Sequence, residues 1–286
     1  MTRESGRRRG MPATVPDAAS AGPDLALAPD PGLAGRADRP VAGIDNGYLA
    51  GYRVRFDEAG ADGNARTGTL LRYAQDIAWR HSEALGFDRT WYSERDRWWV
   101  VRSADLLILA PVPMGTTLRL ATAVIGHRRI WARRRGEFRM PDESVAAVAT
   151  VDWVLLDERG RILRIPDDFG TAFPNEALTD DIVRVALPPA PPDAVGIELA
   201  VRPQDLDPMA HVNNATYVDW IEEVASAAGA AAATVSTPRR IVLEYAASAE
   251  LGDRLRAVAW PDDDGWAVRL SRLADGVDIV RARLSR

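Results

Sequence analysis

Hydrophobic and polar residues alternate with two different periods along this chain, and each change of period predicts a new element. From Tyr52 to Phe56 the alternation has a period of two, which is typical of a strand. From Thr67 to Gly86 the apolar side chains share one broad helical face, and Gly86 is a natural C-terminal stop. Four strand-like runs separated by turn sequences follow, at Trp99–Ala110, Thr116–Gly126, Ile130–Met140 and Val145–Leu156. This order predicts an α+β unit, with the helix lying on an antiparallel sheet.

The same order of elements returns in the later part of the chain. Ile197–Val201 is predicted as a strand, and Asn214–Ala232 as a helix. Four more strands are predicted at Ile241–Ala247, Arg254–Trp260, Trp266–Leu273 and Val277–Leu284. The repetition indicates an internal duplication, in which one chain carries two copies of the same α+β unit.

Two biased segments flank the first unit. Residues 1–47 are rich in Ala, Gly, Pro, Asp and Arg and lack apolar periodicity, so we expect a disordered tail or a start site assigned too far upstream. Arg7–Arg9 are followed by no apolar stretch, so a secretory signal is not expected. Residues 167–194 are rich in Pro and Asp and are interpreted as a linker. The predicted boundaries are 48–170 for the first unit, 171–195 for the linker and 196–286 for the second unit.

The amino-acid composition excludes several classes of function. The chain of 286 residues is 47% hydrophobic and 27% charged with a net charge of −5, a balance typical of a soluble globular protein and not of a nucleic-acid binder. It has no cysteine, which excludes a disulfide scaffold, a thiolate nucleophile and a cysteine zinc site. With only three histidines, we expect no metal and no cofactor. No apolar run approaches the roughly 18 residues of a membrane span, so we expect a cytoplasmic protein without membrane insertion.

The stretch from Arg202 to Glu223 concentrates the candidate chemistry. Asp207-Pro208 predicts a turn, and Asn213 and Asn214 are good N-cap residues for the second helix. Asp207, His211 and the two asparagines would then meet at the positive end of a helix, where backbone N–H groups can bind an oxyanion. The same residues also suit a plain helix cap beside a surface histidine, and the residues alone leave both interpretations open.

Aligning the two predicted helices tests which copy could carry that chemistry. The alignment places His211 opposite Asn64 and Asp207 opposite Gly60, to within one residue. Asn213 and Asn214 fall opposite Arg66 and Thr67. The first copy therefore lacks both the carboxylate and the imidazole. We expect the first unit to bind and shape the substrate, and the second unit to carry the chemistry.

The whole string Asp-x-Asp-Pro-x-x-His-Val-Asn-Asn-x-x-Tyr-x-x-Trp, from Asp205 to Trp220, resembles the signature of hotdog-fold thioesterases. Asp207-Pro208 resembles the catalytic turn of the 4-hydroxybenzoyl-CoA thioesterase group. The run from His211 to Asn214, with Tyr217, Trp220 and Glu223, is similar to the acyl-ACP thioesterases of fatty acid synthesis. The resemblance implies a tandem (double) hotdog, in which each half is an antiparallel sheet wrapped around one long helix, and it implies thioester hydrolysis.

The resemblance also implies roles for these residues. Asp207 would act as the base on water or attack directly, and His211 would orient or protonate the reacting centre. Asn213 and Asn214 would hold the thioester carbonyl or brace the loop. Two positions depart from the plant-type pattern, because Met209 replaces an asparagine and Ser248 replaces a glutamate. Ser248 could position water, but it lacks the Gly-x-Ser-x-Gly elbow of a nucleophile.

Further charged and titratable side chains allow two interpretations each. Glu222 and Glu223 are alternative carboxylates or a solvated helix edge, with Glu223 kept as a supporting residue. His81 is most simply a packed histidine. The run from Gly126 to Arg139 holds six arginines and one acid. Four of them are proposed to bind the carrier or the CoA phosphates: Arg128, Arg133, Arg134 and Arg135. An edge strand protected against aggregation explains the same run.

Together these features predict an acyl-ACP thioesterase, with acyl-CoA as the near alternative substrate. A non-catalytic double-hotdog protein that binds acyl carriers is the alternative from another class. A hotdog dehydratase ranks third, because the histidine-centred motifs of that group are absent. The expected partner is acyl carrier protein or acyl-CoA, and a homodimer is left open.

Overall fold

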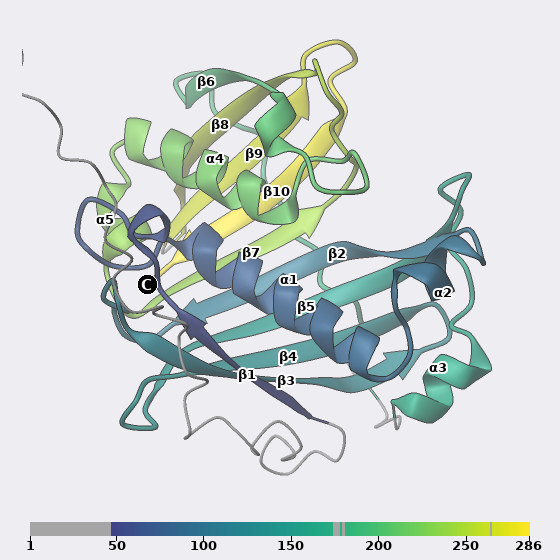
Figure 1. Ribbon diagram of the computed structural model, residues 1–286. Coiled ribbons are helices and arrows are strands. Elements are labelled where there is room, and N and C mark those ends of the chain that lie inside the picture. Colours follow the sequence, from purple (N-terminus) through teal and green to yellow (C-terminus); the bar gives the residue numbers. More distant parts are fainter. Residues whose placement is uncertain (1–46, 174–177, 179–180, 264) are drawn as a thin grey trace, which may run out of the picture.

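The computed structural model describes residues 47–173, 178, 181–263 and 265–286. All but one residue of the tail predicted at 1–47 lies outside this part of the chain. The strands form one sheet of ten in the order β1-β3-β4-β5-β2-β7-β10-β9-β8-β6, and each pairing is antiparallel (Figure 1). The strands of the first half are β1 (Tyr48–Arg53), β2 (Arg97–Ile108), β3 (Thr117–Arg128), β4 (Trp131–Arg139) and β5 (Val145–Asp157). Those of the second half are β6 (Val195–Ala200), β7 (Arg239–Tyr245), β8 (Arg254–Asp262), β9 (Gly265–Arg272) and β10 (Asp278–Ser285).

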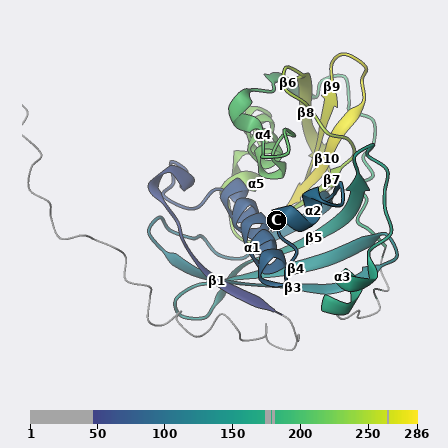
Figure 2. The same ribbon diagram turned by 45° about the vertical axis from the view of Figure 1, so that its right-hand side comes forward.

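Two long helices lie on one side of this sheet, α1 (Thr67–Ala84) and α4 (Asn214–Ala227) (Figures 1 and 2). The short helices are α2 (Arg89–Ser93), α3 (Asp167–Ala172) and α5 (Ala231–Val235), with 3-10 turns η1 (Phe56–Glu58) and η2 (Pro203–Asp205). Gly86, at φ +85°, stands two residues beyond α1, in the left-handed conformation expected of a helix stop. No helix among the described residues is both long and apolar enough to cross a bilayer.

Most predicted elements have bounds within two residues of the observed ones, and two differ by more. The first strand covers Tyr48–Arg53 and not Tyr52–Phe56, because residues 48–53 pair with β3 and the chain turns into η1 at Phe56. The second long helix ends at Ala227 instead of Ala232. Gly229, at φ +90°, breaks it, and α5 follows as a separate turn.

The sheet confirms the internal duplication, because both halves order their strands alike. The order β1-β3-β4-β5-β2 in the first half matches β6-β8-β9-β10-β7 in the second. The halves join through β2 and β7, which pair from Ser103↔Glu244 to Ile108↔Arg239. The expected tandem arrangement, an antiparallel sheet with one long helix in each half, is confirmed, and the two half-sheets join into one continuous sheet of ten strands.

The two long helices contact each other at equivalent positions. Arg72 of α1 and Asp219 of α4 form an ion pair at 2.6 Å. The approach is close at Gly68, because a Cβ built there would lie 2.3 Å from the Asp219 carboxylate. One large apolar core runs between the helices and the sheet through both halves, with residues such as Leu71, Phe138, Ile221 and Leu243 fully buried.

The segment interpreted as a linker is partly built into the fold. Residues 167–172 form α3, and Phe169 and Phe173 are buried in a second apolar cluster with Phe87 and Tyr92. Residues 181–188, which we call the outer strap, cross the sheet from the first half to the second. Val183 N–H donates to Asp152, Val185 N–H donates to Glu244, and Ala186 O accepts from Arg283.

Candidate active site

The loops before α1 and α4 have the same backbone design. The Gly60 N–H donates to Asn64 O, and the Asp207 N–H donates to His211 O, both at 2.8 Å. Each loop contains one residue with positive φ, Gly63 at +77° and Ala210 at +61°. These matched bonds confirm the predicted register, in which Gly60 is equivalent to Asp207 and Asn64 to His211.

Asp207 closes its own turn. Its Oδ1 accepts hydrogen bonds from the backbone N–H of Met209 at 2.8 Å and of His211 at 3.3 Å. This is an Asx turn, in which an aspartate side chain replaces a backbone acceptor. Oδ2 of the half-buried Asp207 has no hydrogen-bond partner among the described residues. One oxygen therefore holds the loop, and the other remains available to water or substrate.

The remaining residues of the motif take up positions around the start of α4. Asn213 is the N-cap, with Oδ1 accepting from Ala215 N–H at 2.9 Å, so its amide N–H groups remain available. Asn214 O accepts a hydrogen bond from the buried Tyr245 hydroxyl at 3.0 Å. The half-buried imidazole of His211 has no hydrogen-bond partner within the described part of the chain. Asp207, His211 and Asn213 therefore share the loop that leads into the 14-residue helix α4.

The two positions that depart from the plant-type pattern are both exposed, one on the Asp207 turn and the other beside the loop. Met209 lies on the turn itself. Ser248 follows β7, and its neighbour Ala249 accepts a hydrogen bond from Val212 N–H and donates one to the Tyr217 hydroxyl. Ser248 thus lies beside the segment that contacts the His211 loop. Glu223 is exposed on α4, and no described side chain contacts it by hydrogen bond or ion pair.

The structure corrects the carrier-binding prediction for two of the four arginines. Arg133 is 8% exposed and forms a bidentate ion pair with buried Asp152, at 2.7 and 3.0 Å. Arg134 is 7% exposed and donates to Nδ1 of His81 at 2.9 Å. Burial and Arg134 lower the pKa of His81 to about 3, so its imidazole is neutral and packed, as predicted. Burial removes both guanidinium groups from any carrier surface.

The side chains of Arg128 and Arg135 are more exposed than those of Arg133 and Arg134. Arg128 donates to Leu178 O and forms an ion pair with Asp181 at 2.8 Å, which ties β3 to the outer strap. Arg135 is exposed and forms an ion pair with Glu137 at 3.1 Å. The carrier contact stays a prediction for these two residues alone.

A second cluster, which sequence reasoning missed, lies at the N-terminus of α1. The Thr67 hydroxyl donates to Oε1 of Glu222 at 2.5 Å and accepts from Nη2 of Arg239 at 3.0 Å. Burial raises the pKa of Glu222 to about 7, although the Thr67 hydrogen bond and Arg239 act against the shift. The helix alignment that placed Thr67 opposite Asn214 was the available signal, since it marks the start of α1 as an equivalent site.

The cluster borders a cavity of about 360 Å³. Its lining comes from the loop before α1, from α4 and from the region of α5 and β7: Gly60, Ala61, Asp62, Asn64, Arg66, Thr67, Glu222, Thr234, Val235 and Arg239. Figures 1 and 2 both show the loop before α1 next to α5.

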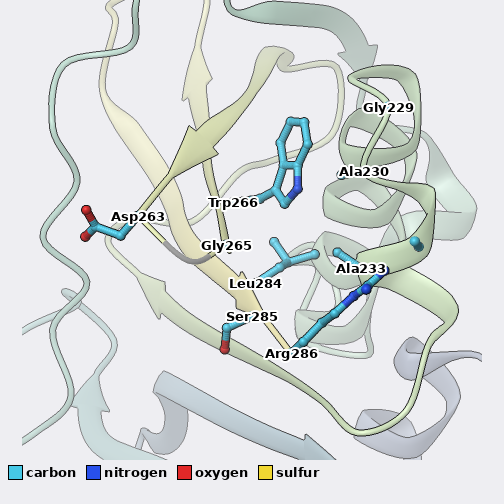
Figure 3. Close-up of a pocket in the computed structure, with 10 residues that line it drawn as sticks. Gly229, Ala230, Ala233, Asp263, Gly265, Trp266, Leu284, Ser285 and Arg286 are labelled. Carbon is cyan, nitrogen blue, oxygen red and sulfur yellow. The ribbon is translucent and has the colours of Figure 1, made fainter.

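A larger cavity of about 440 Å³ lies at the other end of α4, beyond Gly229. Trp266 and Leu284 face Ala230 and Ala233 across it, while Asp263 points away (Figure 3). Neither of these two cavities is lined by Asp207 or His211.

Comparison with known proteins places the two halves in one family. Residues 45–173 match the acyl-ACP thioesterase N-terminal domain, and residues 192–282 match the acyl-ACP thioesterase C-terminal domain. An acyl-[acyl-carrier-protein] hydrolase of Cuphea viscosissima, a chloroplastic protein, is 27% identical over 82% of this chain and 61% of its own length. A palmitoyl-acyl carrier protein thioesterase of Cuphea hookeriana is 26% identical with the same coverage. The chain therefore spans less than two thirds of these relatives.

Solved structures share the fold. The 12:0-ACP thioesterase from Umbellularia californica superposes with a TM-score of 0.71 at 23% identity, covering 85% of this chain and 97% of that one. An acyl-ACP thioesterase from Bacteroides thetaiotaomicron has a TM-score of 0.70 at 14% identity, with coverages of 84% and 97%. With both family domains matched in order across the two halves, the chain belongs to the acyl-ACP thioesterase family.

Proposed function

We propose that this protein hydrolyses acyl-ACP thioesters to a free fatty acid and the carrier thiol, with Asp207 as the principal catalytic carboxylate. The match of both halves to the acyl-ACP thioesterase domains carries this proposal. The relatives named as acyl-ACP hydrolases support the same substrate class. The loop geometry supports the residue assignment, since Asp207 lies on the loop before a long helix together with His211 and the N-cap residue Asn213.

The reaction follows from the groups on this loop. Water attacks the thioester carbonyl while Asp207 removes its proton, and the oxyanion is stabilised by N–H donors at the start of α4 and by the Asn213 amide. Collapse of the tetrahedral intermediate breaks the C–S bond, and the departing thiolate takes a proton from His211 or from Asp207. If Asp207 instead attacks the carbonyl carbon directly, hydrolysis of the resulting mixed anhydride gives the same products.

One set of observations favours a second candidate, a non-catalytic protein that binds acyl carriers. Met209 and Ser248 replace an asparagine and a glutamate of the plant-type pattern, and one oxygen of Asp207 is occupied by its own turn. A protein of this kind would retain the fold and lose turnover.

Release of free thiol separates the two candidates. Purified protein is given acyl-ACP and acyl-CoA over a panel of chain lengths, and the Asp207→Asn variant is compared with wild type. Asparagine keeps the Oδ1 acceptor of the turn and removes the charge. We expect wild type to turn over acyl-ACP faster than acyl-CoA. A binder would retain acyl-ACP in a gel-shift assay but release no thiol.

The carrier contact is tested separately. Arg135 is exposed, so Arg135→Ala should raise KM for acyl-ACP and leave KM for acyl-CoA and kcat unchanged. An unchanged KM for acyl-ACP would remove Arg135 from the carrier surface.

A further inference from the structure

The cavity at the N-terminus of α1 occupies the place in the first half that the Asp207 loop occupies in the second. Gly60 and Asn64, which line the cavity, are the equivalents of Asp207 and His211. Thr67, the first residue of α1, is the equivalent of Asn214, the first residue of α4. The internal duplication therefore provides two equivalent positions, and the sequence at the first one lacks the loop carboxylate.

A carboxyl group reaches the first position from the opposite helix instead. Glu222 of α4 accepts from the Thr67 hydroxyl at 2.5 Å and lines the cavity. By the same two-fold relation that pairs Arg72 with Asp219, the equivalent of Glu222 is Gln75 of α1. In this alignment, the second position combines Asp207 on its loop with Gln75 as the equivalent of Glu222. The first position has Gly60 in place of Asp207, Asp62 elsewhere on its loop, and Glu222 from the facing helix.

The N-terminus of α1 is also capped differently from the N-terminus of α4. Asn213 caps α4 with its own side chain, whereas the N-cap residue of α1, Arg66, provides no side-chain cap. The first N–H groups of a helix have no intrahelical acceptor, so an uncapped N-terminus is a site for a developing negative charge. Here that N-terminus borders a cavity.

A buried cation completes the cluster. Arg239 is 9% exposed, lines the cavity and donates to the Thr67 hydroxyl at 3.0 Å. Its Nε has no hydrogen-bond partner in the described part of the chain. A buried guanidinium N–H without an acceptor costs free energy unless a ligand or water satisfies it. At the edge of the cavity, the Nη2 group of this guanidinium holds the Thr67 hydroxyl in place.

We infer that this cavity is a second thioester-hydrolysing site, in which Glu222 is the general base, the N-terminus of α1 holds the oxyanion, and Arg239 with Thr67 orients Glu222. The inference rests on the proposed function for its substrate class, acyl thioesters. The Glu222 carboxylate takes a proton from water, and the hydroxide oxygen bonds to the carbonyl carbon. The C–S bond then breaks, and the Glu222 carboxyl returns its proton to the departing thiolate, which yields a fatty acid and a thiol.

The charged groups around Glu222 set the expected pH dependence. Arg239 of β7 and Arg66 before α1 favour the carboxylate, while burial and Asp219 of α4 oppose it, and Asp62 acts on Arg239. A base must be unprotonated to act. The rate at this site should therefore rise with pH and reach half its maximum near pH 7.

The test measures thiol release from acyl-CoA and acyl-ACP by Asp207→Asn, Glu222→Gln and the double variant. Asp207→Asn should keep a residual rate that rises through pH 7, and adding Glu222→Gln should lower that residual rate by at least about tenfold, since general bases contribute roughly 10²–10⁴. Glutamine retains the acceptor for Thr67. The matched control is Asp207→Asn with Glu83→Gln, an exposed carboxyl on α1, and it should equal Asp207→Asn. Circular dichroism and Tm verify that each variant is folded.

The outcomes separate the two proposals. If the double variant is as fast as Asp207→Asn, the second site is overturned while the Asp207 proposal stands. If Asp207→Asn is as fast as wild type and Glu222→Gln is inactive, the Asp207 assignment is overturned and the second site is supported. If wild type releases no thiol from either substrate, both are overturned.

Discussion

At the scale of single residues, Glu222 shows how an internal duplication changes a titratable group. Its carboxyl accepts a hydrogen bond from the Thr67 hydroxyl, which in turn accepts one from the buried Arg239 guanidinium. Burial is the largest influence on it and raises its pKa from 4.5 to about 7. A helix position that the sequence presents as a solvated edge is thus a proton-binding group near neutral pH.

This raised pKa makes stability depend on pH in a defined direction. The folded protein holds the Glu222 proton more tightly than the unfolded chain, so the associated stability is full below pH 4.5 and is lost as pH rises to about 7. Glutamine removes the cost of burying the charge. The Tm of Glu222→Gln minus that of wild type should therefore increase between pH 4.5 and pH 7, as measured by thermal melts. A difference that is constant with pH would contradict the burial of a charged Glu222.

The two departures from the plant-type pattern make a second residue-scale prediction. Met209 lies on the Asp207 turn, and Ser248 lies beside the segment bonded to Val212. Met209→Asn combined with Ser248→Glu should raise kcat on acyl-ACP by about tenfold or more, because added acid–base groups contribute roughly 10²–10⁴ when positioned. Both positions are exposed, so folding should be unaffected. A kcat equal to or below that of wild type would indicate a catalytic set that does not need these groups.

At the scale of elements, strand alternation in β4 places neighbouring arginine side chains on opposite faces of the sheet. Arg134 faces α1 through His81, whereas Arg133 points to the other side of the sheet, where Asp152 and the outer strap lie. Successive side chains on a strand point to opposite faces, so a run of arginines cannot form a single patch. The structure gives these neighbours two buried structural roles.

The buried ion pair of β4 predicts a large loss of stability. Arg133→Leu leaves the Asp152 carboxylate buried without its partner, and breaking a buried pair this way costs about 3–5 kcal/mol. Urea denaturation should detect this as a lower free energy of unfolding. Arg135→Ala on the same strand is the control and should change it by less than about 0.5 kcal/mol. Equal effects would show that Arg133 is not held by Asp152.

Comparison of these elements with the sequence shows what the pattern could predict. Alternation and helical spacing located α1, α4 and the order of strands, because each has one buried face. The pattern could not resolve β1, where pairing with β3 selects residues 48–53, or α3, whose Phe169, like Phe173 just after the helix, is isolated among Pro and Asp. The motif located the Asp207 loop. It could not locate the Glu222 cluster, because Thr67, Glu222 and Arg239 meet only through the packing of the two halves.

At the scale of the whole molecule, the outer strap and the β2–β7 pairing join the two halves. Glu244 of β7 is central to this junction. It is buried, accepts from Val185 N–H at 2.9 Å and from Arg184 at 2.8 Å, and lies 3.6 Å from Arg102 and Arg281. The strap is therefore fastened to both halves by charged hydrogen bonds as well as by chain connectivity.

Glu244 makes the strap sensitive to acid. Burial alone would raise the pKa of Glu244, but the hydrogen bonds from Arg184 and Val185 outweigh it and hold the pKa below 4.5. This stability is present above pH 4.5 and is lost as pH falls through the lower folded pKa. Glu244→Gln should lower the free energy of unfolding at pH 7 by about 1–3 kcal/mol, and the deficit should shrink on acidification. A deficit that does not change with pH would contradict the ion pairing.

The proposal that the loop before α4 carries the principal chemistry of this duplicated fold is tested by thiol release from saturating acyl-ACP by Asp207→Asn. We predict that wild type turns over, and that the variant retains the wild-type Tm while its kcat falls by about 10²–10⁴, the range for a positioned general base. A variant that releases thiol at the wild-type rate would contradict it.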